Sequence, residues 1–198
     1  MAEAAATDLL DYAAYLELER TTDQRHEYLR GLVYAMAGGS LAHSALEVAV
    51  AAELRALARG CQVFSSDAKI RVETTGLSTY PDVSVICGTV ERDPADKHAI
   101  RNPTVLVEVL SPSTEAYDRG EKFAHYRELR SLRTYVLVAP HERRIEVYSR
   151  DPSGGWTLHE GRAGELVAIA PLVAPLEIDR VYEGVELDLP PPRMARRG

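Results

Sequence analysis

The stretch Val105-Leu106-Val107-Glu108-Val109-Leu110, residues 105–110, decides how the rest of the sequence is interpreted. Five of its six residues are apolar, which predicts a strand buried on both faces of a sheet. An ionised carboxylate inside such a strand is costly unless it is paired with a cation or bound to a metal. Glu108 is therefore a candidate metal ligand, and a structural ion pair is the alternative.

A second carboxylate, Asp82, begins the strand-like segment 82–87. An aspartate at the start of a strand is also a common turn residue, so Asp82 alone decides little. Two carboxylates that enter a sheet from neighbouring strands are more informative. Together with a substrate phosphate and water, Asp82 and Glu108 could complete the oxygen shell that Mg²⁺ requires.

The segment 113–129, which follows the strand of Glu108, is predicted to be helical. Asp118, Lys122 and Tyr126 recur at every fourth residue and should lie near one helical face. If that face turns toward the sheet, Lys122 comes close to Glu108.

Simpler explanations exist for the same helix. Asp118 and Glu121 have the spacing of a capping box, and Lys122 could be an exposed lysine paired with Asp118. Lysine usage favours a special role, because 20 of the 23 basic residues are arginine and the lysines are Lys69, Lys97 and Lys122. A lysine, unlike an arginine, can lose its proton when its pKa is lowered.

The remaining elements are placed by apolar periodicity and turn residues. They are a capped helix over 7–19, a hairpin over 27–36 turning at Arg30-Gly31, a helix from 38–40 to Gly60, strands at 62–64, 69–73 and 104–110, a second hairpin of 134–139 with 143–149, and sheet extensions at 156–160 and 166–169. This order predicts an α/β (α+β) fold, with a mixed central sheet flanked by helices and an additional C-terminal β-hairpin region. Residues 1–189 are expected to form a single domain, followed by a Pro/Arg-rich tail over 190–198.

Composition narrows the function classes. The net charge of −7 argues against a protein that coats nucleic acid non-specifically. The apolar runs are too short to cross a bilayer, and the N-terminus lacks a secretory signal, so no membrane association and a cytoplasmic location are expected. Cys61 and Cys87 are too few for a disulfide framework, and Cys87 is interpreted as a small core residue.

An ordered set of residues resembles the Uma2 family of the PD-(D/E)xK, or restriction-endonuclease-like, superfamily. The set consists of Tyr80-Pro81-Asp82-Val83, Glu108-Val109-Leu110-Ser111-Pro112-Ser113-Thr114, Tyr117-Asp118, Lys122 and Tyr126, with Arg25, Glu27, Gly31, Met36-Ala37-Gly38 and His43 upstream and 132–138 and Trp156 downstream. The resemblance spans most of the chain. It implies a restriction-endonuclease-like core and a Mg²⁺-dependent endonuclease, with Mn²⁺ as an alternative ion, that hydrolyses phosphodiester bonds of DNA.

The resemblance also implies roles for single residues. Asp82 and Glu108 would bind the metal, with the backbone carbonyl of Val109 as a further ligand. Glu27 matches an acidic position sometimes recruited near the metal.

The catalytic lysine is where the sequence departs from the superfamily. Leu110 stands two residues after Glu108, where the superfamily usually has lysine. In this family the lysine is expected on the following helix, at Lys122, and Lys69 is the rival donor. An ammonium there could orient or deprotonate the attacking water and stabilise the pentavalent phosphate.

Two other function classes stay open at this point. One is a catalytically silent nuclease-fold protein that serves as a binding or assembly module. The other is a hydrolase that uses the carboxylate pair on a sugar. For the nuclease, a homodimer is expected by analogy, because two active sites related by a two-fold axis can cut both strands of a duplex.

Overall fold

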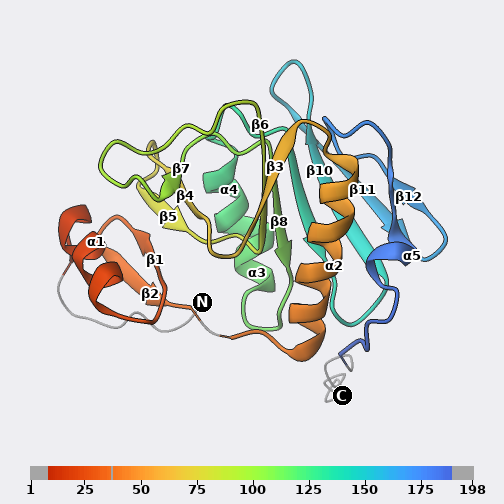
Figure 1. Ribbon diagram of the computed structural model, residues 1–198, viewed down its shortest axis with the longest axis horizontal. Helices are drawn as coiled ribbons and strands as arrows, with labels where there is room; N and C mark the ends of the chain where they lie inside the picture. The colour runs from red at the N-terminus through yellow and green to blue at the C-terminus, as the bar shows by residue number, and fades with distance from the viewer. Residues whose placement is uncertain (1–8, 37, 189–198) are drawn as a thin grey trace, which may run out of the picture.

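A computed structural model describes residues 9–36 and 38–188 of the chain (Figure 1). The predicted cap at Thr7-Asp8, the residue Ala37 of the family resemblance and the tail over 190–198 lie outside the described residues. No helix in the described ranges is both long enough and apolar enough to span a membrane.

A six-stranded mixed sheet contains the apolar segment 105–110. Its strands, in spatial order, are β11 (Trp156–Arg162), β10 (Arg144–Arg150), β9 (Thr134–Val138), β8 (Val105–Val109), β6 (Val83–Cys87) and β3 (Cys61–Ser65). β8 runs parallel to β9 and antiparallel to β6. The prediction that 105–110 forms an interior strand is confirmed, and the strands that follow Asp82 and carry Glu108 are direct neighbours.

Helices cover both faces of this sheet, as an α/β fold requires. The long helix α2 (Leu41–Leu57) packs Leu46 and Val50 against Val107 and Val109 of β8. Alternation along the strand sends Leu106 and Glu108 to the other face, where the helical segment 115–126 lies. The predicted fold class is therefore confirmed.

A second, five-stranded sheet was not expected. Its spatial order is β2 (Leu32–Ala35), β1 (His26–Leu29), β5 (Leu77–Thr79), β4 (Lys69–Val72) and β7 (Ala99–Ile100). The short strands β5 and β7 give no periodic signal, which is why the sequence analysis missed them. With α1 (Tyr12–Thr21), this sheet lies at the opposite end of the molecule from β11 and β12 (Figure 1).

A predicted helix start and a predicted strand pairing were wrong. α1 begins at Tyr12 with Asp11 as its N-cap, because the Asp11 carboxylate accepts a hydrogen bond from the Ala14 amide. The segment 166–169 does not extend the large sheet. Its strand β12 (Leu166–Val167) pairs instead with β13 (Leu176–Glu177), just before α5 (Ile178–Val181).

The predicted hairpins and the start of the long helix are confirmed. β1 and β2 are antiparallel and turn at Arg30 and Gly31, whose φ angles are 49° and 97°. A glycine suits this left-handed turn because it has no Cβ. β9 and β10 form the second hairpin. The side chain of Ser40 caps α2 by accepting a hydrogen bond from the His43 amide.

The helix predicted over 113–129 is shorter and contains a wide turn. It consists of α3 (Glu115–Tyr117), a π-helical turn η1 (Asp118–Lys122) and α4 (Phe123–Tyr126). Asp118 lies inside this segment and is only 2% exposed, so the capping-box interpretation was wrong. Single π-helical turns within α-helices are frequent at functional sites.

Cys61 and Cys87 form a disulfide, which corrects the interpretation of Cys87 as a small core residue. The antiparallel register of β3 and β6 places the two cysteines directly opposite each other, with their Cα atoms 4.2 Å apart. Strand register is a tertiary property, so the spacing of the two cysteines in the sequence did not reveal the pair.

Candidate functional site

A cavity of about 410 Å³ opens where the two sheets, the start of α2 and the segment after β8 meet. Among its lining residues are all those that the sequence analysis proposed for the site: Glu27, Asp82, Glu108, Val109 and Lys122. Glu27 comes from β1, Asp82 precedes β6, Glu108 and Val109 belong to β8, and Lys122 ends the π-helical turn.

Glu108 is almost fully buried, with 4% of its surface exposed, and has two close partners from the helical segment. Its Oε1 lies 3.0 Å from Nζ of Lys122 and accepts a 2.8 Å hydrogen bond from the hydroxyl of Tyr126. Lys122 and Tyr126 therefore reach the same carboxylate oxygen from successive turns. The interpretation of Lys122 as an exposed lysine was wrong, because it is only 5% exposed.

Two further carboxylates surround the Lys122 ammonium. Its Nζ lies 3.2 Å from Glu27 and 3.6 Å from Asp118. Burial by itself lowers the pKa of Lys122, but the negative charges of Glu108 and Glu27 outweigh burial and hold that pKa well above its ordinary value of 10.5. Lys122 therefore keeps its proton at neutral pH.

Negative charge exceeds positive charge in this part of the cavity. Burial raises the pKa of Glu108 well above its ordinary range, and the neighbouring carboxylates of Asp118 and Asp82 raise it further, against the opposing effect of Lys122. The pKa of Asp118 is raised by burial as well. Several carboxylates that share one ammonium make an environment that favours an additional cation.

Asp82 precedes β6 and lies beside the last residue of β8, Val109. Its Oδ2 accepts a 2.6 Å hydrogen bond from the backbone N–H of Val109, one residue after Glu108. The same oxygen lies 3.4 Å from Nε2 of His43, on the first turn of α2. Burial lowers the pKa of His43, but the hydrogen bond and charge of Asp82, with a contribution from Glu47, bring it above its ordinary value of 6.5.

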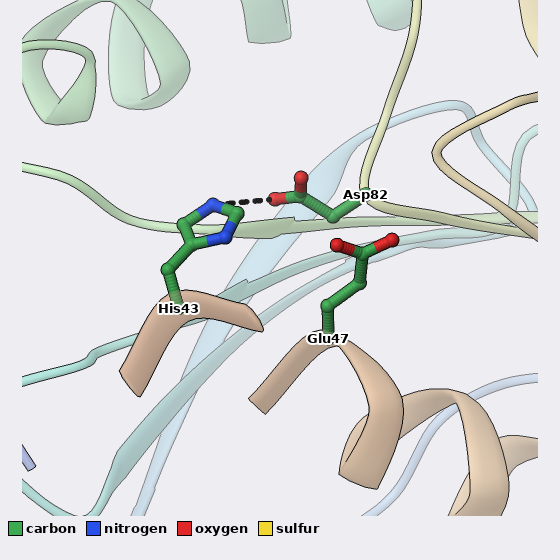
Figure 2. A group of neighbouring side chains, drawn as sticks. All are labelled: His43, Glu47 and Asp82. Carbon is green, nitrogen blue, oxygen red and sulfur yellow. Dashed lines mark ion pairs between the residues drawn. The ribbon is translucent and has the colours of Figure 1, made fainter. Parts of the chain in front are cut away.

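His43, Glu47 and Asp82 form a compact group of metal-ligating side chains within the described part of the chain. One ligand atom from each lies within 4.8 Å of the others, and all three side chains are half-buried. Figure 2 shows the His43 ring facing the Asp82 carboxylate, with the Glu47 carboxylate, from one turn further along α2, on the same side of the ring as Asp82. Glu108 is not in this group.

Sequence reasoning missed the part played by α2 in this group. His43 was noted only through the family resemblance, and Glu47 was not noted at all. A signal was present, since His43 and Glu47 are four residues apart on the helix predicted from 38–40 to Gly60 and must share a face. That face could be recognised as part of the site only once α2 was packed beside Asp82.

Lys69, the rival lysine, does not line the cavity that holds Glu108. It lines a separate cavity of about 700 Å³, where its Nζ lies 2.9 Å from Asp96 and 3.9 Å from Glu19. The rings of Tyr15 and Tyr80 flank the ammonium, with centroids 4.9 and 5.6 Å away. Lys69 is a buried, fully paired cation outside the cavity that holds Glu108.

Comparison with known proteins shows the family and the fold of the chain. Residues 12–181 match the Uma2 family, which is described as "Putative restriction endonuclease". The chain belongs to the Uma2 family. The family assignment made from the sequence is thus confirmed, and the match covers both large sheets and every residue that lines the cavity except Asp188.

Relatives and a solved structure extend the comparison. The uncharacterized Synechocystis protein slr1290 is 36% identical over 176 residues, covering 86% of this chain and 90% of that protein. A second Synechocystis protein, sll1609, is 30% identical and covers 79% of this chain and 89% of that protein. The crystal structure of an Anabaena variabilis protein, described as a "putative nuclease belonging to DUF820", superposes with a TM-score of 0.68 at 18% identity, covering 85% of this chain and 97% of that one. This last likeness shows the fold alone.

Proposed function

We propose that this Uma2 protein is a Mg²⁺-dependent endonuclease that hydrolyses phosphodiester bonds of DNA. The observation that carries the proposal is the buried contact of Lys122 with Glu108 in the cavity that Asp82 also lines. Lys122, from the helical segment, supplies beside Glu108 the positive charge that Leu110 cannot supply.

The residues present fit a divalent cation. Five carboxylates line the cavity, those of Glu27, Asp82, Glu108, Asp118 and Asp188, and among the described lysines Lys122 alone lines it. Such a negative excess favours a hard cation with oxygen ligands. Asp82, Glu108 and the carbonyl of Val109 would hold the ion, since Lys122 and Tyr126 contact only one of the Glu108 oxygens.

When bound, the cation supplies Lewis-acid chemistry, withdrawing charge from the phosphate and making water more acidic. The contribution of Lys122 is electrostatic, because its raised pKa keeps it protonated. Its ammonium would orient the attacking water and stabilise the charge that develops on the phosphate. Of the two roles that the sequence analysis allowed for Lys122, we propose this one rather than proton abstraction.

The test is DNA cleavage by the purified protein on single-stranded and double-stranded substrates with Mg²⁺ or Mn²⁺. EDTA, Asp82→Asn and Glu108→Gln should each abolish cleavage, whereas Glu183→Gln, a change at an exposed acid outside the cavity, should not. Calorimetric titration of Mg²⁺ should show weaker binding to Asp82→Asn than to wild type. Equal cleavage by wild type and both cavity variants would assign the activity to a contaminant. An inert wild type would favour the binding or assembly module instead.

A further inference from the structure

We propose that His43, Glu47 and Asp82 form a second cation site, selective for a divalent first-row transition metal such as Mn²⁺. It would share Asp82 with the proposed Mg²⁺ site but draw its other ligands from α2. The proposal goes beyond nuclease activity, because metal binding at α2 would persist in a protein that cleaves nothing.

The spacing of the ligand atoms suits an ion. Ligands about 2.1 Å from a metal, at tetrahedral or octahedral angles, lie about 3.0 to 3.4 Å from one another. The 3.4 Å between His43 Nε2 and Asp82 Oδ2 already falls in this range. The third atom, from Glu47, lies within 4.8 Å of both, so a small side-chain rotation would complete the set.

Each of the three side chains is held in place by a neighbour that does not itself belong to the group. The Glu47 Oε1 accepts a 2.7 Å hydrogen bond from the Ser66 hydroxyl. A Cβ on Gly39 would lie 2.6 Å from the His43 ring, so the backbone at Gly39 packs directly on the imidazole. Asp82 accepts its hydrogen bond from the Val109 amide. Such outer contacts orient metal ligands and raise affinity.

The two proposed sites differ in chemistry and in position. Glu108 lies on the face of β8 that the helical segment covers, whereas His43 and Glu47 project from α2, which packs on the opposite face. The Glu108 site offers oxygen ligands, which suit Mg²⁺. An imidazole nitrogen suits divalent first-row transition metals better than it suits Mg²⁺, and two carboxylates beside it allow the set to hold Mn²⁺ as well as the later metals of the row.

The experiment measures Mn²⁺ binding in a large excess of Mg²⁺, which occupies all-oxygen sites. Calorimetry gives the affinity, and pulsed electron paramagnetic resonance of the bound Mn²⁺ detects a coupled imidazole nitrogen. Wild type should bind Mn²⁺ with that nitrogen signal. His43→Gln should abolish the signal, and both His43→Gln and Glu47→Gln should weaken binding by at least about tenfold. Gly39→Ala, which crowds the imidazole, should weaken binding as well.

Matched controls separate this site from its surroundings. Glu53→Gln alters another acid of α2, and His159→Gln alters an exposed histidine on β11; both should bind Mn²⁺ as wild type does. Glu108→Gln should keep the nitrogen signal even though the proposed nuclease activity is lost. Mn²⁺ binding that lacks a nitrogen signal, or that survives both α2 variants in full, would overturn the proposal. So would its loss in folded Glu108→Gln protein.

Discussion

Nζ of Lys122 lies 3.0 Å from Oε1 of Glu108, joining the strand β8 to the helical segment that follows it. In the wider superfamily the lysine is expected on the same strand, two residues after the acid that corresponds to Glu108. Here Leu110 occupies that position and is buried in the apolar core around α4. The positive charge reaches the carboxylate from a different element.

Replacing Lys122 tests whether this contact serves chemistry. Lys122→Met should lower turnover by roughly 10²- to 10⁴-fold, as loss of a positioned electrostatic group usually does. Mg²⁺ affinity should change little, because an ammonium is not a ligand. Lys122→Arg should restore little activity, since the guanidinium is larger than the space that the ammonium occupies. Turnover of the folded variants is compared with that of Lys97→Met, a change at an exposed loop lysine. Normal turnover in Lys122→Met would reject the assignment.

Replacing Lys69 should lower the stability of the protein and leave its turnover nearly unchanged. Lys69→Met leaves the buried carboxylate of Asp96 without its 2.9 Å partner. Breaking a buried pair in this way costs about 3 to 5 kcal/mol of the free energy of unfolding. Turnover of the folded fraction should stay near wild type, because Lys69 lines a different cavity. Urea denaturation and single-turnover assays measure the two quantities separately. A stable but inactive Lys69→Met protein would transfer the catalytic role to Lys69.

The raised pKa of Lys122 predicts a pH dependence of stability. Above pH 10.5 the unfolded chain loses the Lys122 proton while the folded protein retains it, so the folded state binds more protons. The free energy of unfolding should then fall with rising pH, by up to about 1.4 kcal/mol per pH unit for this one group. The contribution is fully present below pH 10.5. Urea denaturation between neutral pH and pH 11 should show a steeper alkaline decline for wild type than for Lys122→Met. Parallel curves for the two proteins would contradict the prediction.

The disulfide predicts a sensitivity to reduction. Cys61 and Cys87 are 26 residues apart, and a cross-link that closes a loop of this length stabilises a protein by about 3 to 4 kcal/mol in the chain-entropy description. Dithiothreitol should lower the free energy of unfolding by about that amount. The double variant Cys61→Ser, Cys87→Ser should match the reduced protein and respond no further to dithiothreitol. An unchanged wild-type unfolding curve, with the thiols shown to be reduced, would contradict this expectation.

Much of the fold could be predicted from the sequence, because apolar periodicity and the cost of burying a charged side chain both act over short stretches of chain. The apolar run 105–110 predicted the interior strand that β8 forms over Val105–Val109, and apolar periodicity predicted the long helix, whose residues Leu46, Val50 and Leu54 are buried. The carboxylates of Asp82 and Glu108 stood out because each enters an apolar strand, where an acid needs a partner. The same local logic placed Lys122 and Tyr126 on one helical face.

Other features depended on how distant elements pack, which no local pattern encodes. Strand register decided that Cys61 meets Cys87. The packing of α2 beside β6 brought His43 and Glu47 to Asp82. Which lysine lies beside Glu108 also depended on how distant elements pack. Lys69 lies on β4 of the second sheet, whose short strands give no periodic signal in the sequence. Its ammonium contacts Asp96. Lys122 turns toward Glu108 because the sheet face that carries Glu108 is the one its helical segment covers.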